Sequence, residues 1–220
     1  MYKKIFFALC MLSLVSVLSA KCVSPFYEQA YNELNNMLSG VSNLSFKEAV
    51  FIVENAYYDE TVNKDEFYDI LSEYATICKN VAATNLIQYE LADKESVGNH
   101  AAIFRLMTDS IPLFFNDMEG FIHLPFHYNF DDYAGSKDWS NTFVTKLLTS
   151  HKGNCHSLPI FYKLIAEEMG EKAWLSLAPN HFYIKLRNKQ SGWYNTELTS
   201  GNFPSDVWMK SSGYIHLDAI

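Results

Sequence analysis

One cysteine of this chain stands in a setting that could make it reactive. Cys155 lies in the stretch KGNCHSLP, two residues after Gly153 and four before Pro159. Because proline fits a helix only near its start, Pro159 predicts a helix that begins just upstream, with Cys155 at its N-terminus. Unpaired N–H groups and the helix dipole there favour the nucleophilic thiolate, and the same N–H groups could stabilise an oxyanion. Gly153 is expected to allow the tight turn that presents the thiol.

A thiolate nucleophile needs a base, and the base needs a group that orients it. His181 opens the alternating segment HFYIKLR, and WYNTELT follows after NKQSG, a loop of hairpin length. In such a hairpin His181 faces the region of residues 197 to 199, so Glu197 is predicted to hold the imidazole. Asn195 shares the side of Glu197 but falls nearer Tyr183 or Lys185, and is kept as a reserve for the same role.

Sequence patterns in the second half of the chain predict the helices and strands that carry these residues. Apolar spacing predicts one helix from about Phe143 that ends near Gly153, and a second helix through Met169 with Gly170 as its C-cap. The segment AWLSLA then predicts a strand ahead of the two strands of the hairpin. The order helix, strand, strand, strand indicates an α+β fold.

The first half has helical patterns from about Ser24 to Met107. Ser45 and Glu48 have capping-box spacing ahead of an amphipathic segment, and a second stripe runs through Cys78. Prolines and glycines between residues 111 and 135 predict an irregular connection. We therefore expect a helical N-terminal section with its connection over 21–135 and a core domain over 136–220, or one continuous domain. The ending HLDAI has no polar tail, as in a chain cut short at its C-terminus.

The N-terminus predicts export. Residues 1–20 combine Lys3 and Lys4, an apolar run and small residues ending at Ala20, as in a cleaved signal peptide, with an uncleaved anchor as the alternative. The expected location is secreted or periplasmic, with no membrane span in the mature chain. Cleavage leaves 15 basic against 25 acidic residues. This balance disfavours nucleic acid as a partner.

Three cysteines would survive cleavage. In an oxidising compartment, Cys22 and Cys78 are predicted to form any disulfide, which leaves Cys155 free. A lipid anchor on Cys22 is an alternative, although Lys21 stands where a small residue is expected.

The order of these motifs resembles the transglutaminase-like superfamily of papain-type thiol enzymes. The cysteine at a helix start, the histidine that opens a strand and the element Trp193, Glu197, Thr199 carry the resemblance. GNCHSLPIFYKLIAEEMG and APNHFYIKL are also similar to the branch related to the SirB1 amino-terminal domain. The resemblance covers residues 139 to 201, under a third of the chain.

The resemblance implies a papain-like core and an acyl-transfer enzyme that needs no cofactor and acts on amide or ester bonds of a peptide or protein. Carried over, Cys155 is the nucleophile, His181 the general base and acid, and Glu197 the orienting acid. Glu197 departs from the usual aspartate and must reach the imidazole from a different backbone offset. Papain-like peptidases have a glutamine oxyanion donor six residues before the cysteine, where Thr149 stands here. The indole N–H of Trp139 is considered as the oxyanion donor in place of that glutamine.

Other functions fit some of the same residues. A catalytically inactive binding or scaffolding module with the same fold is the main alternative. A zinc site would use Cys155 and His181 with His151 and His156. Two further patterns are interpreted as structural: the pair His123 and His127, separated by Pro125, as packing residues, and Asp131 and Asp132, with Asn129 and Asp138 nearby, as a solvated turn rather than a calcium loop.

Overall fold

The computed structural model describes residues 24–84, 87–114, 120–178 and 180–211, and it confirms a mixed α+β fold. The described residues up to Thr61 and those from Val62 onward form two compact units. The predicted boundary at 135/136 differs from this division, because α4 and α5 pack against α7 and so belong with the second unit. The elements are α2 (Pro25–Leu38), α3 (Phe46–Tyr57), α4 (Lys64–Ala82), α5 (Lys94–Thr108), β1 (Ile111–Leu113), β2 (Phe121–His123), β3 (His127–Tyr128), η1 (Trp139–Thr142), α6 (Val144–Ser150), β4 (Lys152–Gly153), α7 (Ser157–Glu168), β5 (Trp174–Ala178), β6 (His181–Asn188), β7 (Gly192–Thr196) and α8 (Asp206–Ser211).

The first unit contains α2 and α3, which pack against each other. Ser45 caps α3 by accepting a hydrogen bond from the Glu48 N–H at 3.2 Å, as its spacing predicted. Ala30, Met37, Ile52 and Ala56 are the buried residues of the small core between the two helices.

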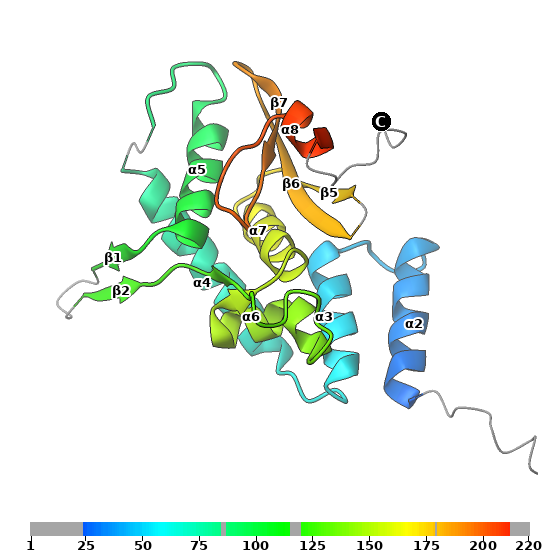
Figure 1. Ribbon diagram of the computed structural model, residues 1–220. Helices are drawn as coiled ribbons and strands as arrows, with labels where there is room; N and C mark the ends of the chain where they lie inside the picture. The colour runs from blue at the N-terminus through cyan, green and yellow to red at the C-terminus, as the bar shows by residue number, and fades with distance from the viewer. Residues whose placement is uncertain (1–23, 85–86, 115–119, 179, 212–220) are drawn as a thin grey trace, which may run out of the picture. The chain divides into compact units, whose positions relative to one another are not determined.

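The second unit is organised around α7. This helix packs against α4, α5 and α6 and against strands β5 and β6 (Figure 1). Its residues Phe161, Tyr162, Leu164 and Ile165 are almost completely buried, which explains why α7 is apolar around most of its circumference. Cys155 therefore precedes the most deeply buried helix of the unit.

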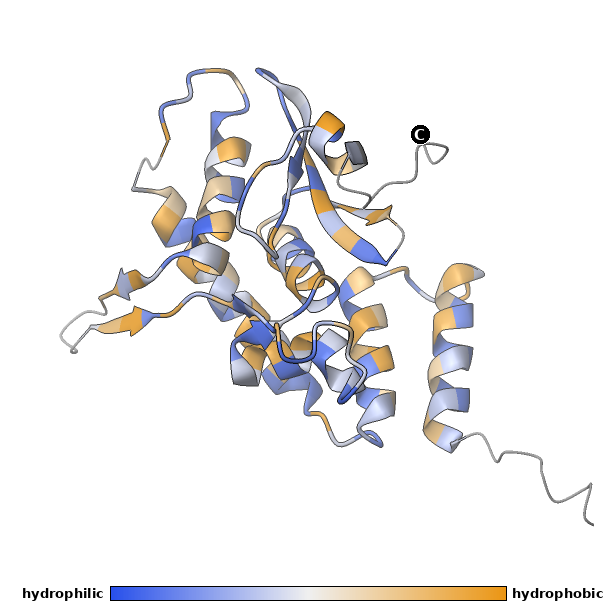
Figure 2. Cartoon of the chain, in the orientation of Figure 1, coloured by the Kyte–Doolittle hydropathy of each residue, from blue (hydrophilic) through white to orange (hydrophobic). Residues whose placement is uncertain are grey.

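Beside α7 lies an antiparallel sheet in the order β5-β6-β7, with β6 in the centre. Figure 2 shows apolar and polar residues alternating along β6, as expected for a strand with two different faces. The register pairs Ile184 with Thr196 and Lys185 with Asn195. The predicted hairpin is confirmed, although β6 extends to Asn188 and β7 starts at Gly192, so the loop is shorter than expected.

The predicted helices of this unit are also present. α6 ends at Ser150, and His151 follows in the left-handed conformation with φ 54°. α7 ends at Glu168, and Gly170 takes a φ of 80°, the conformation that suits a glycine after a helix C-terminus. Within the described residues, no helix is long and apolar enough to cross a membrane.

Candidate active site

The turn that carries Cys155 is fastened by Asn154 and Ser157. The Asn154 Oδ1 accepts hydrogen bonds from the N–H groups of His156 at 2.9 Å and Ser157 at 3.3 Å, as an N-cap side chain does. The Ser157 hydroxyl accepts from the Asn154 N–H at 3.0 Å. Both capping residues are completely buried. The start of α7 is therefore held rigidly from both sides of Cys155.

This arrangement corrects two expectations about the turn. The N–H groups of His156 and Ser157 are occupied by Asn154, so they are not the oxyanion donors considered above, and Cys155 N–H is the backbone donor of the turn that remains. Gly153 is needed for space rather than for an unusual backbone angle. A Cβ at this position would lie 2.5 Å from the Ser157 Oγ and 2.8 Å from the Leu147 Cδ1.

A second buried network supports the turn from the preceding loop. The Asp132 carboxylate accepts hydrogen bonds from the backbone N–H groups of Lys137 and Asp138 and from the Asn141 amide at 2.8 Å. The Ser157 hydroxyl donates in turn to the Asn141 carbonyl at 3.2 Å. The expectation of a solvated turn was wrong for Asp132, because these donors satisfy the carboxylate inside the protein. Burial would raise the Asp132 pKa, but the hydrogen bonds outweigh it and lower the pKa to about 2.

His181 and Glu197 form a buried pair. The His181 Nε2 lies 2.5 Å from the Glu197 Oε2, and the two residues are 5% and 1% exposed. The Glu197 Oε1 accepts from both the backbone N–H and the hydroxyl of Thr199, at 2.9 and 2.8 Å. Both oxygens of the carboxylate are therefore satisfied, and one of them orients the imidazole.

The backbone at Glu197 explains how the longer side chain fits. Glu197 follows the last residue of β7 and forms an isolated antiparallel bridge with Asn202. The acid thus lies just beyond the regular end of the strand, and from there its carboxylate reaches the His181 ring. Glutamate in place of aspartate is compatible with the hydrogen bond to the imidazole.

Cys155 and His181 perturb each other electrostatically. Burial would raise the Cys155 pKa, but hydrogen bonding and charge from His156 and His181 lower it to about 6. Burial would lower the His181 pKa, but hydrogen bonds with Cys155 and Glu197 raise it to about 9. Since Glu197 occupies Nε2, Nδ1 is the nitrogen of His181 that remains for the thiol. These values favour a thiolate and an imidazolium at neutral pH.

The Glu197 carboxyl is the third member of this set. Burial would raise its pKa, but the hydrogen bond to His181 and those from Thr199 lower it below the ordinary value. A carboxylate at this position stabilises the imidazolium, which in turn stabilises the thiolate. The structure therefore brings together the three residues that were predicted to act as a triad, and their catalytic role stays a prediction.

The two supporting residues lie elsewhere. The Asn195 amide nitrogen donates to the Pro204 carbonyl at 3.1 Å and to the Asp206 carboxylate at 2.8 Å, so it attaches β7 to the segment that leads into α8. It does not orient His181. Trp139 begins η1 with its side chain 57% exposed, and the described contacts do not join it to Cys155.

His156 was considered at the sequence level only as a zinc ligand. Its Nδ1 lies 3.9 Å from the Cys155 Sγ, and its ring packs edge-on against Phe182 with a centroid distance of 4.3 Å. The Cys155 Sγ also lies 3.9 Å from the Asn180 carbonyl oxygen. Position next to the cysteine was the one available signal for this contact, and it does not determine where the ring points.

Two of the other histidines considered as ligands, His123 and His151, have structural partners, and His127 lies at the surface. The His123 Nε2 lies 2.8 Å from the Leu106 carbonyl oxygen, and the His151 ring stacks on Phe126 at 4.8 Å. His127 is exposed in β3, so the interpretation as a packing residue holds for His123 and was wrong for His127. In the part of the chain that the structure describes, no group of three or more histidine, cysteine or acidic side chains is placed to hold a metal ion.

Cys78 lies on α4 with no exposed surface, and burial raises the pKa of its thiol to about 12. Its raised pKa contrasts with the lowered pKa of Cys155, although both side chains are buried. Cys22 and the predicted signal peptide lie outside the described residues. The Cys22–Cys78 disulfide and the lipid anchor therefore stay predictions.

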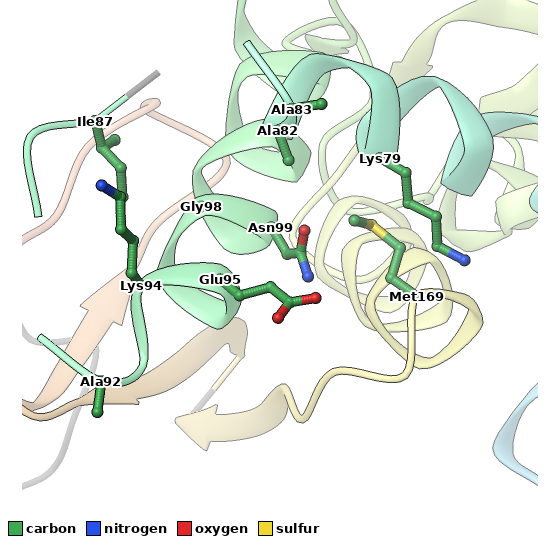
Figure 3. A pocket seen from close by; sticks show the side chains of 10 residues that line it. All are labelled: Lys79, Ala82, Ala83, Ile87, Ala92, Lys94, Glu95, Gly98, Asn99 and Met169. Atoms are coloured by element: carbon green, nitrogen blue, oxygen red, sulfur yellow. The ribbon is translucent and has the colours of Figure 1, made fainter. Parts of the chain in front are cut away.

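An open cavity of about 790 Å³ lies away from the three residues (Figure 3). It is bordered by the end of α4, the start of α5 and Met169 after α7, with Lys79, Glu95 and Asn99 among its lining side chains. Cys155, by contrast, is 7% exposed. This cavity offers space for a ligand away from Cys155, whereas the perturbed pKa values of Cys155 and His181 favour the Cys155 region as the candidate site.

Comparison with family models, with curated proteins and with solved structures yields no match for this chain. The resemblance to the transglutaminase-like superfamily therefore rests on the motifs in the sequence.

Proposed function

We propose that the chain is a transglutaminase-like cysteine hydrolase or acyltransferase that acts on amide bonds of a peptide or protein. Its core would be the papain-like arrangement of α7 with the sheet β5-β6-β7. The observation that carries the proposal is the buried hydrogen bond between His181 and Glu197, together with the mutual pKa shifts of Cys155 and His181. No cofactor is required.

The reaction would proceed through a thioester. The Cys155 thiolate attacks the substrate carbonyl carbon and forms a C–S bond, and the carbonyl π electrons move onto oxygen. When the tetrahedral intermediate collapses, the C–N bond breaks and His181 gives its proton to the leaving amine. Water, or an amine acceptor, then attacks the thioester while His181 takes a proton from it. Release of the acyl product regenerates the thiolate and the imidazolium.

Glu197 and the Cys155 N–H would support this cycle in different ways. The Glu197 carboxylate keeps Nε2 hydrogen-bonded, so His181 presents Nδ1 to sulfur and to the leaving group. The Cys155 N–H would be one oxyanion donor, because Asn154 occupies the next two N–H groups of the turn.

A generic activated ester tests the proposal without knowledge of the substrate. With p-nitrophenyl acetate we expect a burst of p-nitrophenol and an acetyl group on Cys155, detected as a mass increase of the intact protein and located by peptide mapping. The adduct should be absent in Cys155→Ala and present in Cys78→Ala, which removes the buried thiol instead. An adduct that forms equally well in Cys155→Ala would refute the proposal.

The low exposure of Cys155 favours a second candidate, an inactive binding module with the same fold. A binding module has no need of a low thiol pKa. The binding module is the better description if two results are obtained. Cys155 would react with iodoacetamide only when the pH of the reaction reaches the ordinary pKa range of a thiol, and no acyl adduct would form.

We also propose that the protein is secreted or periplasmic, because the sequence of residues 1–20 has the pattern of a signal peptide. The expected mature chain begins at Lys21. Mass measurement of the protein from a secreting host tests this, and an intact Met1 terminus would argue against it.

A further inference from the structure

His156 contacts the Cys155 thiol from a direction of its own. Its Nδ1 lies 3.9 Å from the Sγ, within hydrogen-bond range for sulfur, and His156 is half-buried whereas His181 is buried. The imidazole of His181 comes from β6, and that of His156 comes from the turn of Cys155 itself. The sulfur is therefore approached by two imidazoles from separate elements.

Both the backbone and the ring of His156 are held in place. Its N–H donates to the Asn154 Oδ1 at 2.9 Å. Its ring meets Phe182 at an interplanar angle of 65°, which is the edge-to-face geometry that aromatic pairs prefer. A ring fixed in this way loses little conformational entropy when it forms a hydrogen bond to sulfur.

Few charged groups compete for the site. The titratable groups that act on Cys155 are His156 from its own turn and His181 from β6, with Glu197 acting through His181. Within the described residues, no carboxylate forms an ion pair with His156. Its Nδ1 is thus available to the sulfur, and a proton on Nδ1 exists both in one neutral tautomer and in the imidazolium.

We propose that His156 is a second hydrogen-bond donor to the Cys155 thiolate and acts as a positioning residue for the nucleophile. This inference rests on the function proposed above. His181 must give up its proton to the leaving amine during acylation and must regain one during deacylation. The His156 N–H stays with the sulfur throughout, so it stabilises the thiolate as it forms again from the thioester.

The test is the pH dependence of iodoacetamide labelling at Cys155, followed by mass spectrometry. His156→Phe removes the donor and keeps an aromatic ring against Phe182, and we expect the labelling midpoint to rise by about 1 pH unit. His156→Gln retains an N–H donor and should restore part of that shift. His127→Gln alters an exposed histidine and should leave the midpoint unchanged.

A His156→Phe midpoint equal to that of the unaltered protein, with the acetyl adduct still formed, would overturn this inference and leave the proposed function intact. A second measurement does not depend on the folding of that variant. In the nitrogen NMR spectrum of the imidazoles, Cys155→Ala should shift the His156 Nδ1 signal, because it removes the sulfur acceptor. An unchanged His156 signal would contradict the hydrogen bond.

Discussion

The change Glu197→Gln isolates the charge of the buried acid. Glutamine has nearly the same shape and keeps an oxygen for the Thr199 N–H and hydroxyl, but it no longer stabilises an imidazolium. Against the effect of burial, which lowers it, hydrogen bonds and charge from Cys155 and Glu197 raise the His181 pKa to about 9, so both partners favour the charged ring. Without the carboxylate, His181 keeps only one of the two partners that raise its pKa while burial still lowers it, so the imidazolium is less favoured.

The loss of the imidazolium should appear in the Cys155 thiol. At a pKa of about 6 roughly 90% of the thiol is ionised at neutral pH, against about 3% at the ordinary value. Because a thiolate of higher pKa is also more nucleophilic, the labelling rate at a single pH understates the change. The midpoint of the pH profile is the better measure, and we expect it to rise by at least about 1 unit.

Ester hydrolysis should respond more strongly than labelling. We expect kcat/KM for p-nitrophenyl acetate to fall by about 10²- to 10⁴-fold, as when a histidine loses its orienting acid. Glu167→Gln, on the half-exposed end of α7, is the matched control and should change neither quantity, since an ion pair at the surface contributes little. If Glu197→Gln retains the labelling midpoint while thermal unfolding shows an intact fold, the reasoning about the triad is wrong.

Three further predictions concern the same site. The pH profile of ester hydrolysis should be bell-shaped, rising near pH 6 as Cys155 loses its proton and falling near pH 9 as His181 loses its own; a profile without the upper limb would contradict an imidazolium partner. Gly153→Ala should lower the free energy of unfolding in urea by about 1–3 kcal/mol, since its Cβ would clash with Ser157; an unchanged unfolding midpoint would show that the turn can relax. Asn154→Ala should lower the same free energy by about 0.5–2 kcal/mol through loss of the cap, and Asn154→Asp, which keeps the acceptor, should lose less.

The features that local rules control were predictable from the sequence. Pro159 placed the start of α7 correctly because a proline ring excludes all but the first turn of a helix. The alternation in β6 and β7, with a short loop between them, gave a hairpin in which His181 and Glu197 meet. Both inferences depend on residues within about 20 positions of each other, where backbone geometry leaves few choices.

The supports of the site were missed because their partners are remote or generic. Asn154 uses the N–H groups that a bare helix start would have left for an oxyanion, and the preference of asparagine for helix N-caps was the signal that could have indicated this. Asp132 has the sequence context of an ordinary loop acid. Its donors, at Lys137, Asp138 and Asn141, are brought to it only by the folded loop. The association of α4 and α5 with α7 depends on the tertiary packing of apolar faces, which a pattern along one segment does not specify.

The burial of His181 and Glu197 bears on the choice between a hydrolase and an inactive module. A buried ion pair costs desolvation energy, and apolar residues of similar size are often as stabilising or more so. A fold kept only for binding would not need the acid–base function of an imidazole at 5% exposure held by a carboxylate at 1% exposure. An enzyme gains a general acid and base whose charge is maintained at neutral pH. The desolvation energy of the buried His181–Glu197 pair is thus more readily explained by a chemical role at Cys155 than by a contribution to stability.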